Sequence, residues 1–341
     1  MKKVLIISAV AALALVSCAK VTDQYVGAPE SHEIGFQALT MPQTRAAVDG
    51  TTFPTTLDMM VTAYQVEATG GSAGVYFDAT PFSYQFAGGA SAPSVNASYW
   101  GGNPAKYWPL TPAYINFLAI ANANSDNATD VSWGTNKADQ VTIVMADNSS
   151  AQRDLMYAIG NGAVTQSGNT LTFPTKVDMT FAHAQAWIDF KVKAKTTVET
   201  AITVNSITLT GAKYNGTYTV THTGYNAKTG QSVAGGWSAL GAAQNIAVPG
   251  WTAAALTTSF VTVGNGLMIV PDDAATGDFT SFTINYTFDG KTYEYTYTPA
   301  STQVEQKKHY IYEITFQLHE IFINPTVEDW ADQTATTVTI Q

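Results

Sequence analysis

The sequence predicts an all-β protein with two tandem β-sandwich domains, and three observations support this prediction. Short segments alternate apolar and polar residues with the period of two that strands have, and no long segment has the period of a helix. Gly, Pro, Asn and Asp separate these segments at short intervals, as they do in sandwiches. The chain of 341 residues is long enough for two packed cores.

The chain begins with a segment typical of an export signal, residues 1–17. Basic residues precede an apolar stretch that is too short to span a membrane, and small residues lead up to Cys18. Cys18 is the only cysteine, so no intramolecular disulfide can form. Because Leu15-Val16-Ser17-Cys18 is typical of a bacterial lipobox, we predict that Cys18 carries a lipid that anchors the protein firmly.

Residues 18–45 are predicted to be a leader that contains one short strand. The stretch HEIGFQALT places apolar side chains on one side and polar or small ones on the other, which predicts a half-buried strand. The side chains expected to enter the core are those of Ile34, Phe36 and Ala38. Removal of this plug strand would uncover an apolar groove bordered by unpaired backbone groups.

Arg45 lies in a polar, proline-containing stretch between the plug strand and the body of the protein, which we predict to begin at Ala46. The chain contains only one other arginine, Arg153, against 14 lysines. A guanidinium is therefore scarce in this chain, and its place just before the body of the protein requires an explanation.

The two sandwich domains are predicted at residues 46–195 and 196–341. A strand near the end of the first domain alternates apolar with charged residues, so one face is expected to be buried and the other solvated. Its apolar residues are Ile188, Phe190, Val192 and Ala194. The polar stretch after Lys195 predicts a domain boundary within about ten residues of that position.

The second domain contains a predicted hairpin and ends in a strand-like tail. Asp289-Gly290 separates two alternating segments and favours a tight turn, because both residues accept positive φ. In the tail, Val338 and Ile340 alternate with polar residues, and no cationic side chain interrupts them. This tail has the alternation that could fill a vacated groove, so we predict that it is a donor strand for a neighbouring subunit.

Charge and motifs exclude several classes of function. The formal net charge is −10 and only 12% of residues are charged, which argues against nucleic acid as a partner. The histidines have no metal-ligand spacing, and no motif of a hydrolase or of a phosphate-binding loop occurs. We therefore predict no enzyme activity, no metal and no cofactor.

Three further features have two readings each. Trp100, Tyr107 and Trp108 could stack on a sugar, although aromatic residues that close one end of a sandwich are the simpler reading. The acidic stretch PDDAATGD could offer oxygens to Ca²⁺, but it lacks the spacing of a calcium loop and is expected to be a solvated turn. His183 is expected to pack or to form a hydrogen bond in a strand.

Several segments together resemble the fimbrillin family of Bacteroidota, the pilins of type V pili. The lipobox and the leader ending in IGFQALTMPQTRAA come first, followed by KYWPLTPAYINFLAIAN and VDMTFAHAQAWIDFKVKA. GLMIVPDD, KKHYIYEITFQLHEI and the terminal INPTVEDWADQTATTVTIQ follow in the same order. The resemblance extends over nearly the whole chain.

This resemblance implies two transthyretin-like β-sandwiches and export to the outer membrane as a lipoprotein. It also implies cleavage by an arginine-specific surface protease, for which Arg45 has the matching position. We expect folding of the N-terminal domain to protect Arg153. The expected function is that of a structural pilus subunit that polymerises head to tail by donor-strand exchange and supports cell adhesion.

Two alternatives on the same fold remain open. The chain could be a tip adhesin that contacts a host glycan or protein receptor, with the aromatic cluster at Trp100, Tyr107 and Trp108 as its contact surface. It could also be a fimbrial anchor that stays uncleaved on its lipid at Cys18. The presence of Arg45 argues against the anchor, and the alternating tail favours the stalk subunit over the tip.

Overall fold

The computed structural model describes residues 32–40, 53–68, 73–86, 98–121, 131–145, 152–272, 277–317 and 320–329. Over these residues the protein is all-β apart from one 3-10 turn at Glu199–Ala201, so the predicted fold class is confirmed. The export signal, Cys18, Arg45, Ala46, Val338 and Ile340 lie outside the described residues.

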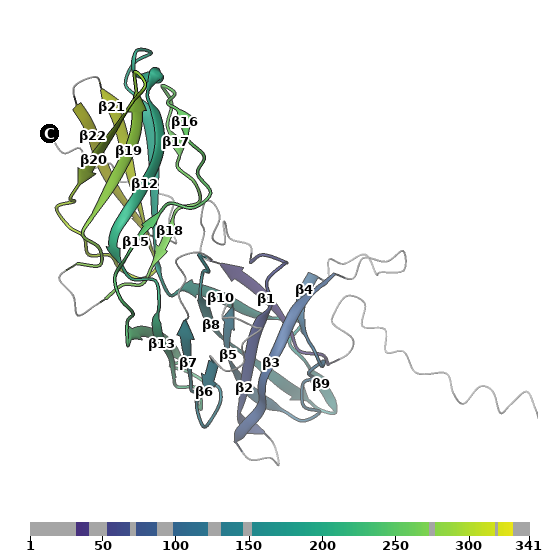
Figure 1. Ribbon diagram of the computed structural model, residues 1–341. Helices are drawn as coiled ribbons and strands as arrows, with labels where there is room; N and C mark the ends of the chain where they lie inside the picture. The colour runs from purple at the N-terminus through teal and green to yellow at the C-terminus, as the bar shows by residue number, and fades with distance from the viewer. Residues whose placement is uncertain are drawn as a thin grey trace, which may run out of the picture.

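An eight-stranded sheet builds the core of the N-terminal part, and all of its strands except β9 join into a closed ring (Figure 1). The ring closes where β10 pairs with β8, through Ala182 with Tyr157 and His183 with Met156. In ring order the strands are β1 (Gly35–Thr40), β4 (Ser98–Gly102), β3 (Gly74–Phe86), β2 (Met59–Ala68), β5 (Ala113–Ala121), β8 (Met156–Ser167) and β10 (Val177–His183). The short β9 (Thr170–Thr172) pairs with the end of β8.

A four-stranded sheet packs against the outside of this ring. Its order is β14 (Ser232–Ser238), β13 (Gly216–Thr223), β7 (Gln140–Met145) and β6 (Val131–Trp133). Successive residues of β5 therefore face two different cores: Phe117 belongs to the core inside the ring, and Leu118 to the core between ring and outer sheet. Both side chains are fully buried.

The C-terminal part is a sandwich of two sheets around one large core. One sheet has the order β17 (Val261–Thr262), β11 (Ala186–Ala194), β21 (Lys308–Gln317) and β22 (Glu320–Asp329), with β18 (Leu267–Ile269) also paired to β11. The other has the order β15 (Gln244–Ala247), β12 (Thr203–Ala212), β19 (Ser281–Phe288) and β20 (Lys291–Tyr297), with β16 (Ala254–Ala255) also paired to β12.

The packing changes from one unit to the other at Ala184 and Gln185, at the edge of the interval of about ten residues predicted around Lys195. β11 precedes Lys195 in the chain but pairs in parallel with β21 of the second sandwich, from Trp187 to Ala194. Conversely, the hairpin of β13 and β14 comes from the second half of the chain but pairs with β7 in the outer sheet of the first. The polar stretch after Lys195 is itself a loop inside the second sandwich, between β11 and β12.

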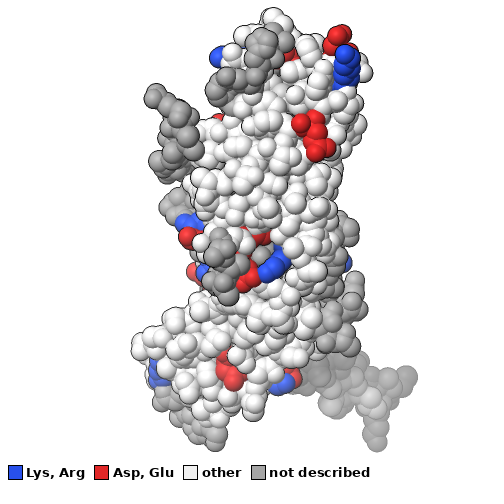
Figure 2. All heavy atoms as spheres, turned by 60° about the vertical axis from the view of Figure 1, so that its left-hand side comes forward, with Lys and Arg blue, Asp and Glu red and all other residues white. Residues whose placement is uncertain are grey.

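The crossing hairpin and the short connection tie the two parts together. The connection between β10 and β11 consists of Ala184 and Gln185, whose carbonyls accept hydrogen bonds from Trp237 Nε1 at 2.6 Å and from the Lys307 N–H at 3.0 Å. The two parts lie end to end in an elongated molecule (Figure 1). The space-filling view shows a surface with few charged groups, as the composition predicts (Figure 2).

Two local predictions for the second sandwich agree with the structure, with one exception. The turn between β19 and β20 has positive φ at both Asp289 and Gly290, as expected for a tight hairpin. The apolar face of β11 is buried, but Asp189, expected on the solvated face, is buried as well. It has a partner there, because His309 Nε2 lies 3.1 Å from its carboxylate.

Candidate functional site

The plug strand β1 forms one wall of the N-terminal ring, between β10 and β4. It pairs in parallel with β10 over five positions, from Phe36 with Val177 to Thr40 with Phe181. Its antiparallel pairing with β4 is shorter and joins Gly35 to Gly101 and Phe36 to Trp100. β10 and β4 do not pair with each other, and β1 lies between them. The ring is therefore complete only when β1 is in place.

The side chains of this strand follow the alternation that the sequence predicts. Ile34 and Phe36 are fully buried, and Ala38 is almost fully buried, whereas Gln37 is exposed. The Phe36 ring makes edge-to-face contacts with Phe82 and Phe117, at centroid distances of 4.9 and 5.1 Å. β1 supplies two members of the core inside the ring, Phe36 and Ala38, and Ile34 just before the strand supplies a third.

A loop before β5 holds the start of the plug strand. The Ile34 N–H donates a hydrogen bond to the Lys106 carbonyl at 2.7 Å, and the Trp108 N–H donates to the His32 carbonyl at 2.6 Å. Glu33 and Tyr107 form a bridge between these two bonds. Residues 106–108 thus extend the wall of the groove beyond the end of β4, which sequence patterns missed because a loop backbone carries no alternation.

The proposed sugar-binding aromatic residues do not form one exposed surface. Trp100 and Trp108 are buried with 4% and 2% of their surface exposed, so neither indole presents a face to a ligand. Trp100 packs against Phe53 and Tyr84, and Trp108 against Phe117. Only Tyr107 is exposed. The simpler reading, aromatic residues packed into the sandwich, describes the two tryptophans.

The two described aspartates of the acidic stretch, Asp272 and Asp278, both have partners. Asp278 is buried, and its carboxylate accepts hydrogen bonds from the Asp272 and Val304 backbone N–H groups. Asp272 forms an ion pair with Lys213. Asp273 lies outside the described residues, among which no cluster of three or more His, Cys, Asp or Glu could hold a metal.

One titratable group with a shifted pKa lies near the start of β1: burial raises the pKa of Tyr76, whose hydroxyl donates a hydrogen bond to the Tyr107 carbonyl at 2.7 Å. The other groups described here lie farther away. Burial raises the pKa of Tyr310 on β21 to about 12 and also raises that of Tyr312. Burial lowers the pKa of His222 on β13, against the opposing effect of a hydrogen bond to Ala138. His183 at the end of β10 is buried, and its Nδ1 lies 2.9 Å from the Asp154 carboxylate. The site at β1 is thus a packing site built from apolar groups and backbone hydrogen bonds.

No helix in the described parts of the chain is long and apolar enough to cross a membrane.

Fold and site together define an all-β protein of two stacked units, in which an N-terminal strand completes the first core. The sequence model of the fimbrillin-like family matches residues 44–330, so the chain belongs to this family. Membership supports a fimbrial-subunit role at the cell surface, with other pilin subunits as partners and a structural rather than catalytic task.

The chain is also similar to solved structures of several bacterial fimbrial proteins. A fimbrial protein from Bacteroides vulgatus is 15% identical, with 88% of this chain and 100% of that chain covered and a TM-score of 0.47. A fimbrial assembly protein from Parabacteroides distasonis is 15% identical, with 90% and 99% covered and a TM-score of 0.42. The tip fimbrial protein Mfa3 from Porphyromonas gingivalis is 14% identical, with 87% and 100% covered and a TM-score of 0.43. A search of the curated proteins found no match.

Proposed function

We propose that the chain is a stalk subunit of type V pili that polymerises when β1 is exchanged for the C-terminal segment of a neighbouring subunit. The observation that carries this proposal is the position of β1 as the strand that closes the ring between β10 and β4. Without β1, the backbone groups on the facing edges of both neighbours lose their partners, and the pockets of Ile34 and Phe36 are empty.

Hydrophobic burial makes the vacated groove a binding site for another strand. Each Ile or Phe side chain contributes roughly 1.5–3 kcal/mol when it is buried, so an empty groove is unfavourable. The tail of the chain offers Val338 and Ile340 at alternating positions. A strand from a second copy would restore both the apolar contacts and the backbone hydrogen bonds, and head-to-tail contacts of this kind extend into a fibre.

Processing would release β1 from the body of the protein. In the proposed order of events, Cys18 first carries the lipid that holds the precursor on the outer membrane. An arginine-specific surface protease then cuts between Arg45 and Ala46. The position of the arginine supports this, because Arg45 lies between the end of β1 at Thr40 and the start of β2 at Met59. A cut after residue 45 would separate β1 covalently from every other strand.

Variants at the cleavage position test the proposal. We expect wild-type fibres to consist of chains that begin with Ala46, as read by N-terminal sequencing. Arg45→Lys keeps the charge but removes the arginine, so this variant is expected to stay lipidated and monomeric, as is Arg45→Ala. Normal fibres from either variant would contradict the cleavage step.

The donor segment needs a separate test. A chain that lacks residues 331–341 should be exported and cleaved but should not polymerise, because no strand can fill its neighbour's groove. Fibres of normal length from this truncated chain would exclude the tail as donor. If the wild-type protein on cells instead retains an acylated Cys18, the uncleaved anchor is the correct alternative.

A further inference from the structure

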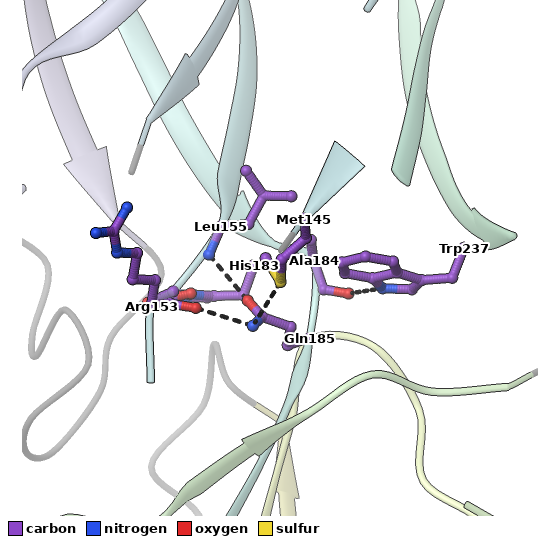
Figure 3. Close-up of polar contacts among 8 residues, drawn as sticks. Met145, Arg153, Leu155, His183, Ala184, Gln185 and Trp237 are labelled. Atoms are coloured by element: carbon purple, nitrogen blue, oxygen red, sulfur yellow. Dashed lines mark hydrogen bonds and ion pairs between the residues drawn. The ribbon is translucent and has the colours of Figure 1, made fainter. Parts of the chain in front are cut away.

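The proposed cleavage requires the protease to distinguish Arg45 from Arg153, the only other arginine of the chain. Burial of the side chain cannot make this distinction, because the Arg153 side chain is exposed. Figure 3 shows its guanidinium pointing away from the neighbouring Gln185. The contacts of the backbone around the Arg153–Asp154 peptide bond can supply protection that burial of the side chain does not.

The side chain of Gln185 holds the backbone on both sides of that bond. Gln185 Nε2 donates a hydrogen bond to the Arg153 carbonyl at 2.9 Å, and Oε1 accepts one from the Leu155 N–H at 2.8 Å (Figure 3). The Gln185 side chain is fully buried. Its amide therefore provides the hydrogen-bonding partners that a neighbouring strand would otherwise provide for two residues of the segment that leads into β8.

Further contacts fix the residues next to this pair of bonds. The Asp154 side chain is buried against His183, and the Leu155 carbonyl accepts a hydrogen bond from the Ala184 N–H at 2.8 Å. Gln152, on the other side of Arg153, has a φ of 48° and accepts a hydrogen bond from the Met268 N–H at 2.6 Å. The backbone around Arg153 is thus tied to the domain connection and to β18.

We propose that Gln185 directs arginine-specific cleavage to the leader by holding the Arg153–Asp154 bond in a conformation that a protease cannot bind. This inference rests on the proposed function, since it concerns the same protease. Proteases cut segments that open locally, so the rate of cleavage follows the population of the open form. Here the open form requires loss of both Gln185 hydrogen bonds and exposure of Asp154 and Leu155, which are buried.

The test compares two glutamine variants in the full chain, treated with a purified arginine-specific protease. Gln185→Met keeps the length of the side chain and removes both hydrogen bonds. We expect cleavage at Arg153 to become faster by roughly fourfold to a hundredfold, since each such bond shifts the opening equilibrium by about two- to tenfold. Gln231→Met is the matched control, because Gln231 donates to Asn116 and Ala227 instead. Its cleavage at Arg153 should remain at the wild-type rate.

Sequencing and hydrogen exchange decide between the outcomes. The new fragment must begin with Asp154 and must disappear when Arg153→Lys is added to Gln185→Met. If Gln185→Met is cut at Arg153 no faster than the wild type, the proposal is wrong. Should this variant fail to fold, slow exchange of the Leu155 amide in the wild type supports the proposal, and exchange as fast as in exposed loops overturns it. None of these results depends on whether Arg45 is cut on cells, which tests the proposed function alone.

Discussion

The ring of Phe36 meets the ring of Phe82 edge to face, with centroids 4.9 Å apart and planes inclined by 74°. This contact joins the plug strand to β3 across the interior of the N-terminal ring, and Phe117 on β5 completes the aromatic group at 5.1 Å. One side chain of β1 thus touches strands that are not its hydrogen-bonding neighbours. The leader is therefore a full member of the core.

Truncation of this side chain should weaken the precursor strongly. Phe36→Ala leaves a cavity in a fully buried aromatic cluster, which typically costs about 3–5 kcal/mol of unfolding free energy. Gln37→Ala on the same strand is the control and should change the unfolding free energy by less than about 0.5 kcal/mol, because this side chain is exposed. Denaturant titration of the uncleaved chains measures both values, and equal stabilities would contradict the role of Phe36 in the core.

A single buried amide holds the turn of the crossing hairpin, between β13 and β14. Asn116 Nδ2 donates to the carbonyls of Tyr225 at 2.6 Å and Ala227 at 2.8 Å, and its Oδ1 accepts from Gln231. Asn116→Ala leaves these partners without their hydrogen bonds and should cost about 2–4 kcal/mol. Hydrogen exchange should show the loss first at the tip between β13 and β14.

A neighbouring asparagine provides the control for this variant. Asn161 lies opposite Asn116 in the pairing of β5 with β8 and also bonds Gln231, but it is exposed. Asn161→Ala should therefore have an effect of less than about 0.5 kcal/mol. A similar loss in both variants would show that the buried amide is not what holds the hairpin.

The alternation of apolar and polar residues predicted the strands that have one solvent-exposed face. It did not predict strands whose two faces are both covered by other parts of the protein. β1 and β11 were found because their apolar residues recur with period two. β5 is apolar on nearly every residue, since it separates the core inside the ring from the core under the outer sheet. No local pattern states which sheet covers the second face, so neither the ring nor the outer sheet could be predicted.

The candidate site was predictable in part for the same reason. The inward residues of β1 follow from their spacing, but the partners of its backbone do not. Lys106 and Trp108 hold the start of β1 through main-chain groups, which every residue type possesses. The sequence also did not predict the contacts of Gln185, because a polar residue next to a strand is expected to be solvated unless its two backbone partners are known.

Acid should weaken the outer sheet through His222. This side chain is buried, its Nδ1–H donates to the Ala138 carbonyl at 2.9 Å, and its Nε2 has no hydrogen-bond partner within the described residues. Burial lowers its pKa in the folded state below the usual 6.5, so the unfolded chain binds the proton more readily. Stability should therefore fall as the pH decreases from 6.5 towards the folded-state pKa, by at most about 1.4 kcal/mol per pH unit.

A variant without the titrating ring isolates this contribution. His222→Asn keeps a donor near the position of Nδ1 but cannot be protonated. The slope of unfolding free energy against pH below 6.5 should be smaller in this variant than in the wild type. Parallel curves for the two proteins would assign the acid sensitivity to other groups.

A glycine in β8 makes room for the indole under the loop that holds β1. A Cβ added at Gly162 would overlap the six-membered ring of Trp108, whereas a Cβ at Gly236 in β14 would meet no atom within 4 Å. Trp108 has little space to move, because its indole is buried and packs against the buried ring of Phe117, with centroids 5.9 Å apart. Gly162→Ala should therefore cost about 1–3 kcal/mol of unfolding free energy through overpacking, and Gly236→Ala should cost much less.

Hydrogen exchange tests whether this overpacking also loosens β1. The Trp108–His32 and Ile34–Lys106 hydrogen bonds hold the same end of the groove. If displacement of Trp108 breaks the first bond, the amide of Ile34 should exchange faster in Gly162→Ala than in Gly236→Ala. Unchanged exchange at Ile34 together with a loss of stability would confine the effect to the core and separate it from the hold on β1.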